Sequence, residues 1–176
     1  MERLKLLALS GSLRKTSYNT HAINALKALA PSNVDITIGE IAKLPLFNPD
    51  RERDDIPALK KLKSDLKQSS GLIIATPEYA HGISGPMKNA LDWLVSGDEF
   101  PYKPIMLINT SPRASHAQQA LVEVLTTMSG HVIDASYLSI PLLSSDLDAE
   151  GIVANPDLAD ALLARLDVFC AEIVKA

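Results

Sequence analysis

A dense run of hydrogen-bond donors follows the first apolar segment of the chain. The candidate donors between residues 10 and 20 are Ser10, Ser12, Arg14, Ser17, Asn19 and Thr20. An arginine can hold a phosphate through two parallel hydrogen bonds, and free backbone amides at a helix start also favour an anion. Gly11 is expected to permit a tight backbone turn in this loop. The density of donors predicts a phosphate site more strongly than a polar loop in which Ser17 merely caps a helix.

The glycine pattern of the loop argues against two common phosphate motifs. The dinucleotide fingerprint G-x-G-x-x-G needs glycines that this loop lacks. Glu40, near the end of the second apolar segment, is therefore not interpreted as a ribose-binding acid. The P-loop sequence G-x-x-x-x-G-K-[ST] is also absent from the chain. The loop is predicted to bind the phosphate of a mononucleotide.

A second loop, residues 76–84, has the composition of a slot for a flat tricyclic ring. Pro77 and Gly82 can shape the loop, and Tyr79 can flank a ring. Backbone amides between Glu78 and Gly82 can bond the polar edge of that ring. We expect Glu78 to orient the loop rather than to transfer protons. His81 is expected to be a solvated loop histidine, with a role as general acid as the alternative.

Strand and helix patterns alternate along the chain and position these two loops. Strands are expected at residues 3–9, 34–38, 71–76, 105–109 and 132–138. Helices are expected at residues 19–30, 57–68, 84–95 and 115–129, and from residue 156 onwards. Residues 41–56 and 141–152 are expected to be irregular. The alternation predicts an α/β fold, a flavodoxin-like three-layer sandwich whose five-stranded parallel sheet has the order 2-1-3-4-5. Ligands of such sheets bind beyond the carboxyl ends of the strands, here after residues 9, 76 and 109.

Local signals mark the starts of three helices. Ser84 is expected to cap the helix that follows the second loop. Gln118 is expected to reach back to the amide of Ser115 in a capping box. Asn155 followed by Pro156 is a typical start for the last helix.

Several other residues are expected to have structural roles. Trp93 is expected to lie in the core or in an interface, and Lys88 and Asp92 to form an ion pair on the surface. Cys170 lies on the apolar stripe of the last helix and is expected to be a small buried hydrophobe rather than a redox nucleophile. The four histidines are dispersed, so no metal site is expected.

Composition limits the classes of protein that remain. The 176 residues predict a single domain spanning residues 1–176. A net charge of −4 gives no basic footprint for nucleic acid, and no apolar stretch approaches the ~20 residues needed to cross a bilayer. The single cysteine and the lack of a signal-peptide pattern favour the cytoplasm.

Taken together, the two loops strongly resemble the NADPH-dependent FMN reductase family, whose flavodoxin-like members include quinone, azo-dye and chromate reductases. The family motif G-S-x-R-x-x-S-x-N corresponds to residues 11–19. A second motif, P-E-Y-N followed by G-x-x-K-N-A-x-D-W, corresponds to residues 77–80 and 85–93. Residues 44–48 are also similar to the family's loop after the second strand. The resemblance extends over about residues 3–130.

The resemblance implies FMN as the cofactor and assigns roles to the two loops. Ser12, Arg14, Ser17 and Asn19 would hold the phosphate, and Pro77, Glu78, Tyr79 and Gly82 would line the isoalloxazine. The full set of expected cofactor-binding residues is Ser10, Ser12, Arg14, Ser17, Asn19, Thr20, Pro77, Glu78, Tyr79, Ala80, Gly82 and Ser111. No catalytic side chain and no metal ligand is expected, because the flavin carries the chemistry.

The resemblance also implies a reaction and a kind of assembly. The protein would pass hydride from NADPH or NADH through bound FMN to a small electron acceptor, which could be a quinone, an azo dye, a metal oxyanion or free flavin. It would form a homodimer or homotetramer with the flavin near the subunit interface. One alternative is a flavodoxin-type FMN electron carrier to a protein partner, without NAD(P)H oxidation. Flavodoxins typically have T-x-T-G-x-T in the first loop and are usually far more acidic. The other alternative is a flavin-free regulatory or scaffold domain that kept the fold.

Two positions depart from the family pattern. Ala80 replaces the asparagine of P-E-Y-N, which would remove a side-chain hydrogen-bonding group near the ring or the ribityl chain. Residues 111–116 read S-P-R-A-S-H, whereas this loop is commonly rich in glycine in the family. These bulkier residues would narrow the flavin slot, or Arg113 would add a contact to the nucleotide.

Overall fold

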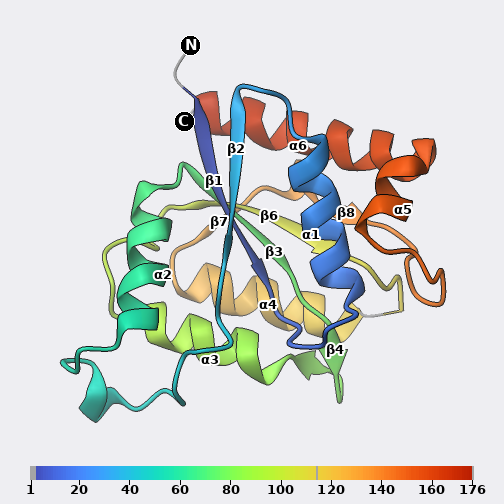
Figure 1. The fold of residues 1–176 in the computed structure, drawn as a ribbon. Helices are drawn as coiled ribbons and strands as arrows, with labels where there is room; N and C mark the ends of the chain where they lie inside the picture. The colour runs from blue at the N-terminus through green and yellow to red at the C-terminus, as the bar shows by residue number, and fades with distance from the viewer. Residues whose placement is uncertain (1–2, 114, 176) are drawn as a thin grey trace.

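The chain folds into a parallel β-sheet with helices on both faces (Figure 1). The computed structural model describes residues 3–113 and 115–175. The strands, in their order across the sheet, are β2 (Val34–Gly39), β1 (Leu4–Ser10), β3 (Gly71–Ala75), β6 (Pro104–Asn109) and β7 (His131–Val132), with β8 (Leu138–Ser139) also pairing with β6. All these pairs are parallel. The predicted fold and strand order are confirmed.

Two apolar clusters, one on each face, hold the helices against the sheet. One face carries α1 (Tyr18–Leu29), α5 (Ala149–Ala154) and α6 (Pro156–Lys175); the other carries α2 (Pro57–Gln68), α3 (Gly85–Leu94) and α4 (Ser115–Thr127). Side chains alternate between the faces along β1, so Leu6 packs with the first group and Leu7 with the second. Both leucines are almost completely buried, which explains why the strand is continuously apolar.

The expected fifth strand is interrupted. β7 pairs with the start of β6 and β8 with its end, and a 3-10 turn, η2 (Asp134–Ser136), lies between them. From Ile105 to Ile108 β6 advances three residues, whereas its partner advances six, from Val132 to Leu138. The three additional residues form the turn, where the Ser136 hydroxyl donates to the carbonyl of Ile133 (2.8 Å).

The two segments expected to be irregular contain short helices. Residues 41–56 include the 3-10 helix η1 (Pro49–Arg51), and α5 begins within residues 141–152. The loop after β3 contains a small antiparallel hairpin, β4 (Glu78–Tyr79) and β5 (Gly82–Ile83), that was not predicted. Across the described residues, no helix combines the length and apolar composition needed to cross a membrane.

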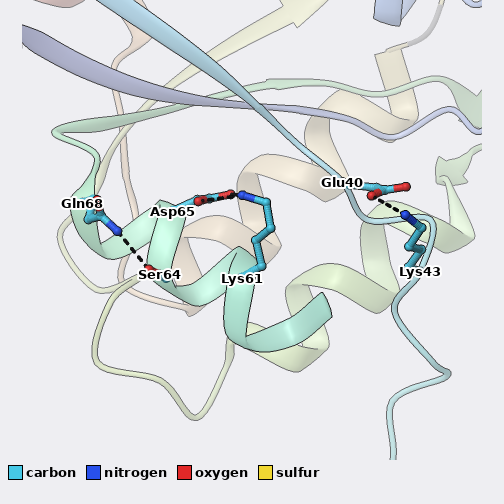
Figure 2. A network of polar contacts seen from close by, with 6 residues as sticks. All are labelled: Glu40, Lys43, Lys61, Ser64, Asp65 and Gln68. Carbon is cyan, nitrogen blue, oxygen red and sulfur yellow. Dashed lines mark hydrogen bonds and ion pairs between the residues drawn. The ribbon is translucent and has the colours of Figure 1, made fainter. Parts of the chain in front are cut away.

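The solvent side of α2 carries polar pairs one helical turn apart (Figure 2). The Lys61 ammonium contacts Asp65 at 2.8 Å, and the Gln68 amide donates to Ser64 at 2.9 Å. Glu40, after β2, forms an exposed ion pair with Lys43 at 3.1 Å. Such pairs stabilise a helix or turn by only a few tenths of a kcal/mol. Glu40 is thus engaged in an exposed ion pair with Lys43.

Candidate functional site

A cavity of about 210 Å³ lies at the carboxyl edge of the sheet, where β1, β3 and β6 end. The loop after β1 contributes Ser12, Arg14, Ser17 and Asn19 from the expected set. The loops after β3 and β6 contribute Pro77, Glu78, Tyr79 and Ser111. Eight of the twelve expected residues therefore line one cavity, because parallel strands end at the same edge of the sheet.

Three polar side chains of the first loop are buried against the cavity. Ser17 caps α1, accepting from the amide of Thr20 (3.4 Å), and it also lines the cavity. Ser12 accepts from the amide of Arg14 (3.4 Å), and its hydroxyl hydrogen can still be donated to a ligand. The Asn19 oxygen accepts from the hydroxyl of Thr110 (3.2 Å), so its amide hydrogens are the donors that remain.

Arg14 supplies the cation of this loop. Its side chain lines the cavity and is exposed, and no carboxylate among residues 3–113 and 115–175 forms an ion pair with it. A guanidinium in this position can receive a dianionic phosphate without first breaking an internal ion pair.

Ser10 and Thr20 lie outside the cavity lining and join the end of β1 to α1. Their hydroxyls are 2.8 Å apart, and Ser10 also accepts from the amide of Ser12 (3.3 Å). These two residues therefore stabilise the conformation of the loop without lining the cavity.

Gly11 is required for close packing rather than for an unusual backbone angle. The described Gly11 does not adopt a positive φ, which corrects the expectation of a turn that needs glycine. A Cβ atom at this position would lie 2.7 Å from Cβ of Thr76 and 2.9 Å from Oγ of Ser84. Only glycine allows the loops after β1 and β3 to approach this closely.

Ser84 connects three elements next to the cavity. It caps α3 as predicted, accepting from the amide of Met87 (3.4 Å). Its hydroxyl also donates to the carbonyl of Gly11 (2.6 Å) and lies 3.1 Å from the hydroxyl of Thr76. The side chain is completely buried, so these contacts are shielded from water.

The hairpin β4–β5 holds two residues in the left-handed region. Ala80 has φ 50° and His81 has φ 59°, the pattern of a type I′ turn, in which asparagine and glycine are favoured. Ala80 and Gly82 belong to this hairpin and lie outside the cavity lining. Replacing asparagine by alanine at position 80 therefore affects the turn conformation, because asparagine tolerates a positive φ better than alanine does.

Two contacts fix the hairpin to the start of α4. The amide of Ala117 donates to Oε2 of Glu78 (2.9 Å), and the rings of His81 and His116 stack with centroids 4.4 Å apart and planes within 8°. Glu78 thus orients the loop, as its position suggested. Both histidines are exposed.

The predicted capping box at the start of α4 is wrong. Gln118 is buried, and neither polar atom of its side chain has a hydrogen-bond partner among the described residues. The amide of Ser115 instead donates to the carbonyl of Arg113 (3.1 Å), and Glu78, 39 residues before Ala117, accepts from the amide of Ala117. A carboxylate at a helix N-terminus is favoured by the helix dipole, so the distant Glu78 stabilises the first turn of α4 that the local glutamine was expected to cap.

Five cavity residues were not among the expected set, namely Tyr18, Thr76, Asn109, Thr110 and Leu143. The first four lie beside expected residues or at strand ends, so the strand boundaries could have indicated them. Leu143 comes from the segment before α5, for which the sequence had no signal. In the third loop Arg113 is exposed, and Ala114 lies outside the described residues.

Residues of the α3 motif fix the loop after β2. The side chain of Asn89 accepts from the amide of Phe47 (2.8 Å) and donates to the carbonyl of Pro45 (3.0 Å). Trp93 donates to the same carbonyl (2.8 Å), and its ring meets that of Phe47 edge-on at 5.1 Å. Trp93 is 1% exposed, which confirms its structural role.

Lys88 is paired as predicted, whereas Cys170 is only partly buried rather than buried as expected. Lys88 and Asp92 form a partly exposed ion pair at 2.6 Å. Burial, with the charge of Asp167 as a smaller cause, raises the pKa of Cys170 to about 11, so the thiol stays protonated at neutral pH. Among the described residues, no cluster of three or more His, Cys, Asp or Glu side chains could hold a metal ion.

The donor set of the cavity fits a phosphate ester that carries a flat ring. One wall offers a guanidinium, two serine hydroxyls and an amide, and another offers Pro77 and the half-exposed ring of Tyr79. The residues present therefore match the two ends of FMN.

Comparisons with known proteins also point to FMN as the cofactor. The model of the family described as NADPH-dependent FMN reductase matches residues 4–143. An NAD(P)H-dependent FMN reductase of Pseudomonas aeruginosa is 30% identical over 154 residues, which cover 84% of this chain and 83% of the relative. A 2-hydroxy-1,4-benzoquinone reductase of Burkholderia sp is 31% identical over 174 residues, covering 96% of this chain and 95% of the relative.

Solved structures support the assignment at the level of the fold. The flavoenzyme FerB of Paracoccus denitrificans, an NAD(P)H:(acceptor) oxidoreductase, superimposes with a TM-score of 0.87 at 28% identity, over 98% of both chains. A flavodoxin from the domain Archaea has a TM-score of 0.60 at 17% identity, over 98% of this chain and all of the other, and this likeness shows the fold alone. The resemblance seen in the two sequence motifs is confirmed, and the chain belongs to the NADPH-dependent FMN reductase family.

Proposed function

We propose that this NAD(P)H-dependent oxidoreductase holds FMN in the cavity at the carboxyl edge of the sheet and reduces a quinone. The observation that carries the proposal is the pairing, in one cavity, of the Arg14 guanidinium with a wall formed by Pro77 and Tyr79. The chemistry that FMN supplies when bound is reversible transfer of two electrons as hydride.

The residues of the first loop are proposed to anchor the phosphate. Arg14 neutralises its charge, while Ser12, Ser17 and Asn19 donate hydrogen bonds from buried positions. The start of α1 adds the favourable end of its dipole. These contacts fix one end of the cofactor and leave the other end to the hairpin.

The hairpin is proposed to position the ring and to leave one side open for the reactants. Tyr79 is 49% exposed and lines the cavity, so it can contact both the ring and a molecule that stacks on it. Glu78 is engaged at the start of α4, which makes it a positioning residue rather than a proton donor. No side-chain acid or base is assigned a step.

A quinone is proposed as the acceptor because the Burkholderia relative, which is aligned over nearly its whole length, is named for a benzoquinone. A planar quinone can stack on the same open ring face as a nicotinamide, so one surface serves both reactants in turn. An azo dye, a metal oxyanion or free flavin is the competing acceptor class, and steady-state rates with one member of each class would distinguish them.

Residues 1–176 are proposed to act as one FMN-binding domain that assembles as a homodimer or homotetramer in the cytoplasm. Leu46 supports the assembly, because it is 85% exposed although its loop is fixed by Asn89 and Trp93. Burial of this side chain against a second subunit would remove its apolar surface from water and so favour association. Light scattering after size-exclusion chromatography would give the mass of the assembly.

An anaerobic titration tests the function. The apoprotein is reconstituted with FMN and titrated with NADPH while the visible absorption of the flavin is followed. Stoichiometric binding followed by rapid two-electron bleaching is expected. Tight binding without bleaching by NADPH or NADH would identify an electron carrier of the flavodoxin type. A folded protein that does not bind FMN would be a flavin-free domain, and the proposal would be wrong.

A further inference from the structure

A second cavity, of about 370 Å³, adjoins the cavity assigned to FMN. The two cavities share Arg14 and Tyr18, so these side chains stand at their junction. The remaining walls come from the first loop, from α1 and from residues 146–148 before α5. A substituent that extends outward from a phosphate at Arg14 would enter this second cavity.

The groups that line the second cavity match the parts of a nucleoside monophosphate. Thr16 and His21 can donate hydrogen bonds to a phosphate beside Arg14. Asp146 and Asp148 can accept from the two hydroxyls of a ribose, the role that an acidic residue has in dinucleotide sites. The remaining lining residues, Tyr18 and Leu147, present an aromatic ring and an aliphatic side chain to a base.

The walls of the second cavity are fixed by hydrogen bonds. The amide of Asp146 donates to the hydroxyl of Tyr18 (3.4 Å), which joins the segment before α5 to the first turn of α1. Oδ1 of Asp148 accepts from the amide of Gly151 (2.8 Å), and the amide of Leu147 donates to the hydroxyl of Ser145 (3.2 Å). Both carboxylates are thus presented from an ordered segment, which lowers the entropic cost of binding.

We propose that the second cavity binds the adenosine monophosphate half of FAD, so that this protein takes FAD as well as FMN. FAD differs from FMN only beyond the phosphate, where adenosine monophosphate is attached through a pyrophosphate bond. The flavin ring therefore keeps its place when the larger cofactor binds. The inference rests on the proposed position of the FMN phosphate at Arg14.

The test compares the binding of FMN and FAD to the apoprotein by isothermal titration calorimetry. The wild-type protein is expected to bind FAD no more than about tenfold more weakly than FMN. The double variant His21→Ala, Asp146→Gly removes one phosphate donor and one ribose acceptor, and glycine accepts the φ of 54° at position 146. This variant is expected to lose about tenfold or more in FAD affinity while its FMN affinity changes by less than about twofold.

A matched variant, His131→Ala, removes an exposed imidazole from β7, outside the lining of either cavity, and is expected to change neither affinity. FAD binding more than about tenfold weaker than FMN binding in the wild type would overturn the inference and leave the proposed function intact. Equal losses for both flavins in the double variant would also overturn it. So would a selective loss of NADPH binding, because the cavity would then serve the electron donor. If neither flavin binds the wild type, the proposed function fails, and this inference fails with it.

Discussion

The two loops that carry most of the cavity wall are held in place in different ways. In residues 10–17, side chains bond the backbone of their own loop, as Ser12 does with the amide of Arg14. None of these residues, all of them described, has a positive φ. The hairpin β4–β5 holds Ala80 and His81 in the left-handed region, and Glu78 and His81 contact α4. The first loop combines hydrogen bonds within itself with a buried bond from Ser84, whereas the hairpin is held through its contacts with α4.

Because the two loops are held in different ways, we expect them to affect different properties of the site. A loop held both by its own hydrogen bonds and by a buried bond to Ser84 keeps its shape whether or not a ligand is present, and such preorganisation increases affinity. A hairpin held by a neighbouring helix can shift when that helix shifts. We therefore expect the first loop to control cofactor affinity and the hairpin to control the rate of hydride transfer.

The largest expected effect comes from Gly11→Ala, which tests whether the first loop tolerates any added volume. The new methyl group overlaps Thr76 and Ser84. The free energy of unfolding should fall by about 3 kcal/mol, and FMN binding should be lost. Urea denaturation and calorimetry measure the two effects. Gly85→Ala is the matched control, because nothing lies within 4 Å of a Cβ atom there. Wild-type stability of Gly11→Ala would mean that the two loops are not closely packed.

Arg14→Ala tests whether the affinity for FMN can fall without a loss of protein stability. Removing a charge-assisted contact with the phosphate should weaken FMN binding by about 30-fold. The urea midpoint should not change, because Arg14 is exposed. Lys15→Ala makes the same change of charge one residue away, outside the cavity lining, and should weaken binding by no more than about twofold. Equal effects of the two substitutions would show that only the net charge of the loop matters.

Glu78→Ala tests the dependence of the hairpin on α4. Loss of the bond to the amide of Ala117 should lower the free energy of unfolding by about 1 kcal/mol. The rate of flavin reduction by NADPH in stopped flow should fall more than the affinity for FMN. Glu123→Ala, which removes an exposed carboxylate from α4 itself, is the control. If FMN affinity falls as much as the rate, the division between the two loops is wrong.

Ala80→Asn should have the smallest effect of these substitutions, and it should raise the free energy of unfolding rather than lower it. Asparagine adopts a positive φ more readily than alanine, so the substitution should stabilise the protein by about 0.5 kcal/mol. Ala80→Val should destabilise it, because a β-branched residue is strained at φ 50°. Thermal unfolding of both variants gives the comparison. A lower midpoint for Ala80→Asn would contradict the assignment of strain to this turn.

The features that the sequence predicted well are those with a local cause. The sheet order follows from alternating strands and helices, and α2 has the predicted bounds because Pro57 begins it and its leucines share one face. Ser84 and Asn155 cap their helices as expected, since a cap joins residues three positions apart. The hydrogen-bond donors of the first loop could also be predicted from the sequence, because they lie close together in the chain.

The features that were missed depend on contacts between distant residues. The hairpin turn has Ala80 and His81 where asparagine and glycine are the usual signals, so its composition did not indicate a turn. Gln118 has the spacing of a capping box, but the amide of Ser115 donates to the carbonyl of Arg113, and the distant Glu78 bonds the amide of Ala117. The break between β7 and β8 follows from pairing with β6, which no local pattern reveals.

The buried hydroxyl of Ser84 has a consequence for how this protein is made. It reaches back 73 residues to the carbonyl of Gly11, and Leu143 lines the adjoining cavity from much later in the chain. A ribosome delivers the first loop early, before β3 and Ser84, which hold this loop in place, have been synthesised. On the proposed assignment of the cavity to FMN, the cofactor can be captured only after residue 143 has been synthesised.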